Sequence, residues 1–184
     1  DPSFQTVKFS AELASKAKFL KNGQNFDAIS AVAAKWFLFF DPPQHTEIRG
    51  PISRIWNTYD IVAEIEDTTE ECLQLIADKD RVDIIREFAV FVPARVVCRI
   101  LGLPPADYAK FKAWSYSFNS VFEPFATLYD IQKYNRSAEE FTQYMDHVIE
   151  KKILRPDDKF ISKLIEENEK GDKPLDRSEL ISVI

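Results

Sequence analysis

Residues 41–49, which read Asp-Pro-Pro-Gln-His-Thr-Glu-Ile-Arg, carry the side chains in this chain that are best suited to bind a ligand. Asp41 can accept backbone amide hydrogens at the start of a helix, and Gln44 follows at the spacing of a capping box. His45 and Arg49 are four residues apart, so they share one face of the first two helical turns. The helix dipole favours negative charge at that end. The pattern therefore predicts a site for a carboxylate or a phosphate.

A second interpretation of the same pair is that both residues are ordinary surface side chains. A histidine and an arginine on a helix are usually solvated or paired with a neighbouring acid. Spacing alone favours this interpretation, so the choice between the two depends on the surrounding sequence.

Other chemistries find no support in the sequence. It has no Gly-x-Gly-x-x-Gly, no Walker-type phosphate loop and no Gly-x-Ser-x-Gly elbow. Its histidines are His45 and His147, and it has no Cys-x-x-Cys, so a zinc or non-haem iron site held by protein ligands is not expected. We expect His147 to be exposed and assign it no role. Catalysis would have to come from a cofactor.

The two cysteines also lie in helical patterns. We expect Cys98 to be a core residue, because cysteine is among the most often buried residue types, and Cys72 could instead be a partly exposed thiol. Two cysteines far apart in the sequence favour a reducing compartment over a disulfide framework.

Composition points to a mainly α chain with one sizeable core. Of its 184 residues 45% are hydrophobic, and only 4 are glycine, well below the usual ~7%. The net charge of -6 argues against nucleic-acid binding, which needs a basic surface. No run of 18 apolar residues is present, so we expect no membrane segment in this chain. A targeting segment upstream of Asp1 stays open.

Apolar periodicity predicts about seven helices. One covers residues 7–20. A long amphipathic helix starts near Tyr59, and its acidic residues form either a solvated face or, alternatively, a surface for a basic redox partner. Its expected apolar positions are Ile61, Ile65, Leu73 and Ile76, and its acids are Glu64, Glu66, Asp67, Glu70 and Glu71. A later helix of roughly five turns has an apolar stripe at Ile131, Tyr134, Ala138, Phe141, Met145 and Val148.

Two prolines should disturb this helical pattern, because a proline inside a helix clashes with the preceding turn. Gly50-Pro51 should interrupt the helix that carries His45 and Arg49, just after the anion face. Pro93 should cost stability unless its helix bends or begins there, and we expect a bent helix.

Several segments, taken in order, resemble the cytochrome P-450 superfamily of haem-thiolate monooxygenases, in its soluble bacterial form. Residues 41–49 are similar to the start of the family's helix C, with Trp56 at its following aromatic position. Residues 83–97 and the exit 100–104, Ile-Leu-Gly-Leu-Pro, resemble helix E, and residues 107–118 suit helix F. Residues 157–165 resemble the start of helix H, and residues 176–181 resemble the entry to helix I.

The resemblance implies a fold and a place within it. The chain would be a single-domain fragment, residues 1–184, formed by the central helical portion of the fold, helices C to H. The family's N-terminal sheet region and its C-terminal haem-ligand loop would be absent. The axial cysteine of haem b would therefore not be in this chain, and the fragment alone would be inactive.

The resemblance also implies roles for particular residues. His45 and Arg49 would hold a haem propionate. The apolar run 36–40 is most simply core, although in the family it borders the substrate chamber, so Leu38 and Phe39 are candidate substrate-binding residues. The aromatics at Trp114, Tyr116, Phe118, Phe122 and Phe125 suit a bulky apolar substrate or plain packing between helices equally well.

The complete protein would then be a cytoplasmic monooxygenase that inserts oxygen into a small apolar substrate. Its electrons would come from a ferredoxin or a flavoprotein reductase. The alternative is a P-450-like helical segment that has lost haem and serves as a binding or scaffold module.

Overall fold

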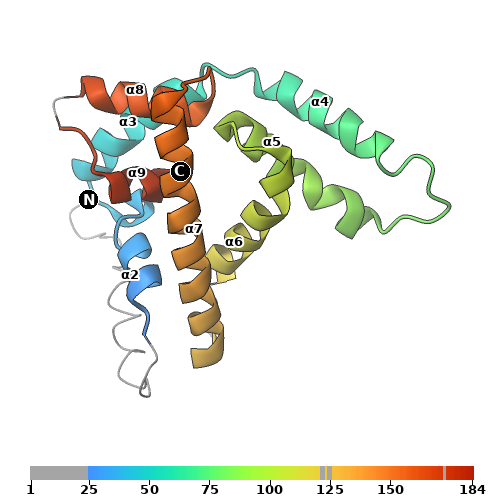
Figure 1. Cartoon of the computed structure of the whole chain (residues 1–184), viewed down its shortest axis with the longest axis horizontal. Helices are drawn as coiled ribbons and strands as arrows, with labels where there is room; N and C mark the ends of the chain where they lie inside the picture. Colours follow the sequence, from blue (N-terminus) through green and yellow to red (C-terminus); the bar gives the residue numbers. More distant parts are fainter. Residues whose placement is uncertain (1–24, 121–122, 124–125, 172) are drawn as a thin grey trace.

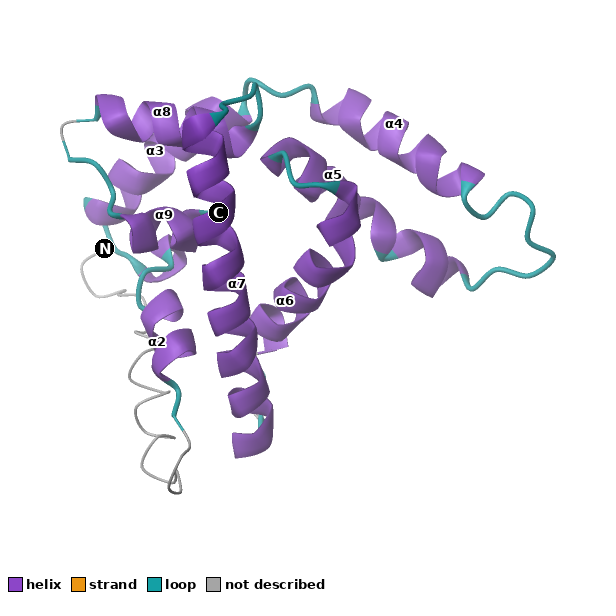
Figure 2. Ribbon diagram, viewed as in Figure 1, coloured by secondary structure: helices purple, strands orange, loops and turns teal. Residues whose placement is uncertain are grey.

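The computed structural model describes residues 25–120, 123, 126–171 and 173–184, and all regular structure in these residues is helical (Figures 1 and 2). The predicted mainly α class is confirmed. The helix expected over residues 7–20 lies outside the described residues. The helices are α2 (Asp27–Ala33), α3 (Gln44–Trp56), α4 (Ile61–Gln74), α5 (Phe91–Leu101), α6 (Tyr108–Ser120), α7 (Leu128–Leu154), α8 (Phe160–Lys170) and α9 (Arg177–Val183). Three short helical turns join them: η1 (Phe37–Phe39), η2 (Ile85–Ala89) and η3 (Pro105–Asp107).

Helix α7 is the long central element of the fold (Figure 1). It begins with a capping box in which Thr127 and Asp130 bond each other's backbone amides. All six residues of the predicted apolar stripe are buried. The helix is longer than the five turns expected, since it spans 27 residues. Its stripe packs against α2 and α6 and, at its far end, against α8 and α9.

The buried residues form two clusters that meet along α7. The larger lies between α5, α6, α7 and α8 and includes Ile100, Met145 and Ile161, which are almost fully buried. The smaller joins α2 to the first half of α7 through Ile29 and Ile131. Burying these aliphatic side chains is the main force that holds the helices together. None of the helices in the described residues is long and apolar enough to cross a membrane.

Helix α5 explains the roles of Pro93 and Gly102. The π-helical turn η2 precedes α5, and Pro93 is the third residue of α5, where the amide has no helical partner. The helix therefore begins two residues before Pro93, whereas we expected a bend at this proline. At the other end, Gly102 has φ +77° and caps the helix. The Leu103 amide donates to Cys98 O at 2.9 Å and the Gly102 amide to Arg99 O at 3.1 Å, the two bonds of a Schellman motif.

Helix α3 differs from the prediction at its start and in its middle. It begins at Gln44 after the cap residue Pro43, which makes no side-chain capping bond, so the capping box predicted from Asp41 is wrong. The Asp41 carbonyl instead accepts from the His45 amide at 3.1 Å. The interruption predicted at Gly50-Pro51 is also wrong, because α3 continues through Pro51 to Trp56. Packing of Ile55 and Trp56 against the core stabilises this second half despite the proline.

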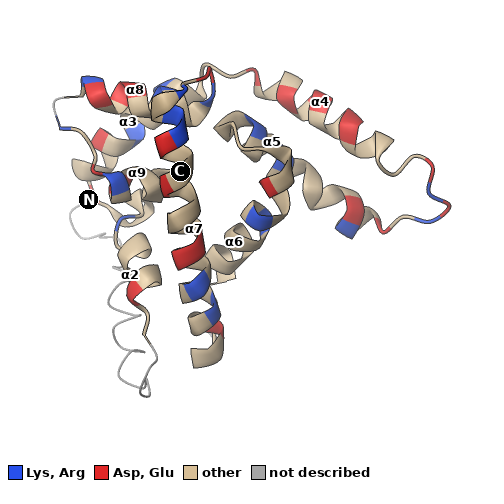
Figure 3. Cartoon of the chain, viewed as in Figure 1, with Lys and Arg blue, Asp and Glu red and all other residues tan. Residues whose placement is uncertain are grey.

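Helix α4 buries a different side from the one expected. Thr68 and Cys72 are buried against α5, whereas Ile65 and Leu73 are exposed, so the predicted apolar packing face is wrong for these two residues. The solvated acidic face is found for Glu66, Asp67, Glu70 and Glu71, which are exposed, but not for Glu64, which is half-buried. Glu64 and Glu71 accept hydrogen bonds from Arg99 of α5, while Glu66 and Glu70 stay exposed. Figure 3 shows acidic residues at several places along α4.

Candidate functional site

His45 and Arg49 lie one turn apart on α3, as their spacing predicts. The His45 ring is half-buried, and its centroid is 5.9 Å from that of Phe37 in the turn η1. Arg49 is exposed and has no hydrogen bond or ion pair from its side chain to any other described residue. The structure therefore places a half-buried imidazole and an exposed guanidinium, which has no ion pair within the described residues, one turn apart on α3.

Arg54, on the same helix, gives a useful contrast. Its Nη2 lies 2.5 Å from Glu167 Oε1 of α8, so its charge is already compensated within the fold. This ion pair lies at a mixed groove of about 760 Å³ between α3, α8 and the loop before α9. Neither His45 nor Arg49 lines that groove. Arg54 thus joins α3 to α8, whereas Arg49 makes no ion pair within the described part of the chain.

An apolar pocket of about 320 Å³ lies between the end of the 36–40 run, α6, α7 and the end of α9. Leu38 lines it and is largely exposed. Its walls are mostly aromatic and aliphatic and come from Trp36, Phe111, Trp114, Phe118, Phe141 and Ile181. A cavity lined in this way suits an apolar ligand.

The aromatic side chains around this pocket pack in mutually tilted pairs. Phe118 meets the ring of Phe141 edge-on at 5.1 Å and that of Trp36 at 5.9 Å. Such pairs fix the walls of a cavity more firmly than aliphatic side chains would. Trp114 is buried here, whereas Tyr116 is exposed and points away from the core. Phe122 and Phe125 lie outside the described residues.

The second residue predicted to line a substrate chamber, Phe39, is not among the lining residues of this pocket. Its ring packs 6.2 Å from that of Trp36, in the cluster between α2 and α7. Trp36 is the residue of the run that sequence reasoning missed. The sequence gives little indication of this role for Trp36, because a run of five consecutive apolar residues does not reveal which of them faces a cavity.

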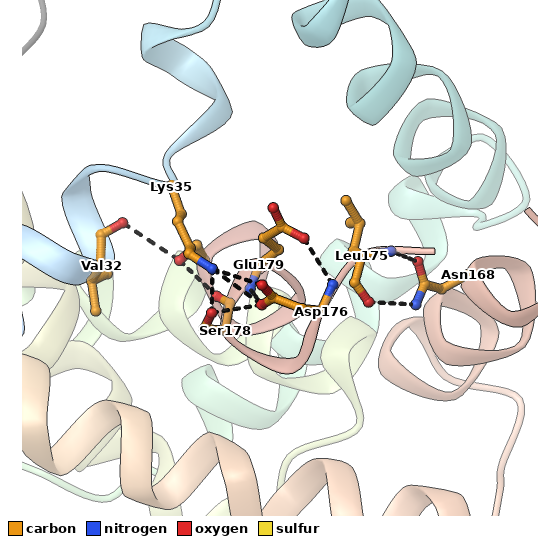
Figure 4. A network of polar contacts seen from close by, with 8 residues as sticks. Val32, Lys35, Asn168, Leu175, Asp176, Ser178 and Glu179 are labelled. Carbon is orange, nitrogen blue, oxygen red and sulfur yellow. Dashed lines mark hydrogen bonds and ion pairs between the residues drawn. The ribbon is translucent and has the colours of Figure 1, made fainter. Parts of the chain in front are cut away.

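A polar network holds the end of α2 to the start of α9 and so positions one wall of the pocket (Figure 4). Lys35 donates to both carboxylate oxygens of Asp176, at 3.0 and 3.1 Å, and bonds Ser178. Asp176 also forms a capping box with Glu179. The Ser178 hydroxyl, the Glu179 amide and Lys35, in that order, hold the pKa of the Asp176 carboxyl well below its ordinary value.

Both cysteines are buried, so neither is a reactive surface thiol. Cys98 is a core residue as expected, and burial, followed by the nearby Asp107 carboxylate, raises the pKa of its thiol to about 12. Cys72 is only 2% exposed, which rules out the partly exposed thiol considered for it. His147 is exposed, as expected.

Comparison with solved structures identifies the fold. The chain matches a crystal structure of P450BioI, in complex with a fatty-acid-ligated acyl carrier protein, with a TM-score of 0.78 and 22% identity, over 99% of this chain and 45% of that one. CalO2 matches with a TM-score of 0.81 and 19% identity, over 99% and 44%. The chain has the central helical portion of the cytochrome P450 fold.

Sequence comparison finds similarity to bacterial cytochrome P450 proteins. The chain is 28% identical to cytochrome P450 CYP107DY1 of Priestia megaterium over 151 residues, 80% of this chain and 36% of the relative. It is 28% identical to mycinamicin IV hydroxylase/epoxidase of Micromonospora griseorubida, covering 79% and 36%, and 29% identical to 6-deoxyerythronolide B hydroxylase of Saccharopolyspora erythraea, covering 78% and 35%. No protein-family model matches the chain. The chain is similar to bacterial members of the cytochrome P450 superfamily, and it spans little more than a third of the length of these relatives.

Proposed function

We propose that these 184 residues are the central helical part of a haem-thiolate monooxygenase, and that His45 and Arg49 anchor a propionate of its haem. The observation that carries the proposal is the pair itself. A half-buried imidazole and an exposed guanidinium lie one turn apart on α3, and among the described residues Arg49 has no acid of its own.

The residues present fit a haem carboxylate. A guanidinium binds a carboxylate through two parallel N–H bonds, and an imidazole nitrogen can donate a third. The Phe37 ring lies beside the His45 ring, with 5.9 Å between the two centroids. When bound, haem with a thiolate ligand supplies the oxygen-activating chemistry, and this ligand would come from outside residues 1–184.

The substrate of the complete enzyme would be a small apolar molecule. The pocket beside Leu38 has the aromatic and aliphatic lining that such a molecule needs, and Phe39 would support this wall through Trp36. Two of the relatives are named mycinamicin IV hydroxylase/epoxidase and 6-deoxyerythronolide B hydroxylase, which supports oxygen insertion as the reaction. The electron donor would be a ferredoxin or a flavoprotein reductase, and the enzyme would work in the cytoplasm.

The test is the absorption spectrum of the complete purified polypeptide that contains these residues, reduced and under carbon monoxide. A thiolate-type Soret band supports the proposal, because it requires both bound haem and a cysteine ligand. A protein that folds, as judged by its circular dichroism, but binds no added haem would overturn it and favour a haem-free binding or scaffold module.

A further inference from the structure

A small pocket of about 190 Å³ lies where the end of α4, the loop after it, the turn η2 and α5 meet. Figure 1 shows this loop returning from α4 toward α5 at the edge of the molecule. The pocket shares no lining residue with the pocket beside Leu38, so the two are separate cavities. Its apolar lining comes from Cys72, Leu75, Ile76 and Phe91, and its charged lining from Lys79, Glu87 and Arg95.

Arg95 is a half-buried arginine without an acid. Its Nε is buried and has no hydrogen-bond acceptor, and its side chain makes no ion pair with any described residue. Its guanidinium carbon lies 5.7 Å from the centroid of the Tyr108 ring on α6, which favours the positive charge but supplies no carboxylate oxygen. Buried donors are almost always satisfied, because an unpaired donor has lost its bonds to water. Arg95 therefore needs an acceptor, which a ligand in this pocket can supply.

The other two charged side chains of the pocket compensate each other. Lys79 Nζ donates to Glu87 Oε2, and the two form an ion pair. One uncompensated charge remains in the pocket, the guanidinium of Arg95, so a monoanion matches it better than a doubly charged phosphate. Lys112 Nζ lies 4.4 Å from the centroid of the Phe91 ring but does not line the pocket, and its charge adds a longer-range attraction for an anion.

The size of the pocket limits the ligand. Its volume equals roughly six water molecules in the liquid, and it is below the ~300 Å³ at which sites for drug-sized ligands begin. We propose that it binds a small ionised monocarboxylic acid, with the carboxylate against Arg95 and the apolar body against Leu75, Ile76 and Phe91. A guanidinium and a carboxylate match through two parallel N–H bonds, which favours this anion. Because the walls come from α4, η2 and α5, the bound acid would also join α4 to α5.

Isothermal titration calorimetry of the complete polypeptide with hexanoate tests this site. Hexan-1-ol and inorganic phosphate serve as comparisons, because the first lacks the charge and the second lacks the apolar body. We expect saturable binding of hexanoate and weaker binding of both comparison ligands. Arg95→Gln should weaken hexanoate binding at least about 10-fold, since a charge-assisted pair is lost. Arg81→Gln, which changes an exposed arginine of the same loop outside the pocket lining, should leave the affinity unchanged.

A second pair of variants tests where the apolar body lies, and it also serves if Arg95→Gln does not fold. Leu75→Trp adds bulk to the wall of the pocket. Leu73→Trp adds the same bulk at a neighbouring exposed position that does not line it. We expect only Leu75→Trp to weaken the binding of hexanoate.

Several results would overturn the inference. One is the absence of saturable binding, and another is equal affinity of the unchanged protein and Arg95→Gln, which is expected if hexanoate enters the pocket beside Leu38 instead. Equal effects of Leu75→Trp and Leu73→Trp, or binding of hexan-1-ol or phosphate as tight as that of hexanoate, would overturn it as well. The inference requires no haem, so none of these results bears on the propionate site at His45 and Arg49.

Discussion

Arg99 of α5 and Glu64 of α4 form the ion pair that holds α4 to the rest of the fold, with 3.0 Å between Nε and Oε2. The two side chains are only 27% and 18% exposed. Arg99 Nη1 also lies 2.6 Å from Glu71 Oε1, and Glu64 lies 3.5 Å from Lys159 Nζ of the segment before α8. One arginine thus pairs with two acids that lie two turns apart on α4.

Replacing Arg99 by alanine should destabilise the fold. It would leave Glu64 partly buried with only the more distant Lys159, and we expect a loss of about 1–3 kcal/mol in the free energy of unfolding. The measurement is urea unfolding followed by circular dichroism. Arg86→Ala is the control, because its 3.7 Å pair with Asp83 is highly exposed, and it should change stability by less than about 0.5 kcal/mol. Equal effects of the two substitutions would contradict the role given to Arg99.

The orientation of α4 also shows where sequence reasoning fails. The stripe of α7 could be predicted because its large apolar residues recur along one line and are buried on the side that they define. On α4, the side that carries Glu64 faces Arg99, which is 35 residues away in the sequence. No local pattern in α4 reveals this contact. The spacing of His45 and Arg49 was enough to predict that they share one helix face. The contribution of α9 to the pocket could not be predicted, because α9 is far in sequence from the other elements that line the pocket.

Gly102→Ala should be destabilising, because the residue has φ +77° and an added Cβ would lie 2.7 Å from Lys159 Cβ. The left-handed backbone alone costs about 1–2 kcal/mol in a residue with a side chain. Gly50→Ala is the matched control within α3. The nearest atom to its new Cβ would be Arg54 Nη1 at 3.7 Å, and alanine favours a helix over glycine by roughly 0.5–1 kcal/mol. In thermal unfolding, the melting temperature should therefore fall for Gly102→Ala and rise for Gly50→Ala. A shift of both melting temperatures in the same direction would contradict this account.

The network at the start of α9 should give a recognisable pH dependence. Folding lowers the pKa of Asp176. The carboxylate therefore stabilises the folded state above its pKa in the unfolded chain, about 3.9, and this stabilisation is lost as the pH falls below that value. Asp176→Asn keeps a capping carbonyl but loses the charge. We expect its melting temperature to lie below that of the unchanged protein at pH 6 and the difference to shrink toward pH 2. A difference that does not vary with pH, or an equal one for the exposed Asp78→Asn, would count against the network.

Both cysteines should resist thiol reagents in the native state. Burial raises the pKa of Cys98 to about 12, so little thiolate forms at pH 8, and Cys72 is sterically covered. We expect Ellman's reagent to label neither thiol before denaturation and both afterwards. Because the pKa of Cys98 is raised on folding, its neutral form stabilises the fold below the unfolded value of about 8.5, and this contribution is lost at higher pH. Rapid labelling of the native protein would refute the burial of these residues.

The most direct test of the central claim is the haem affinity of the complete polypeptide with His45 and Arg49 both replaced by alanine. Loss of charge-assisted bonds to a propionate, worth about 1.5–3 kcal/mol, should weaken haem binding roughly 10- to 100-fold in a spectrophotometric titration. Arg54→Ala, which removes a cation from the same helix but breaks only its pair with Glu167, should leave the affinity unchanged. Unchanged haem affinity in the double variant would contradict the propionate site.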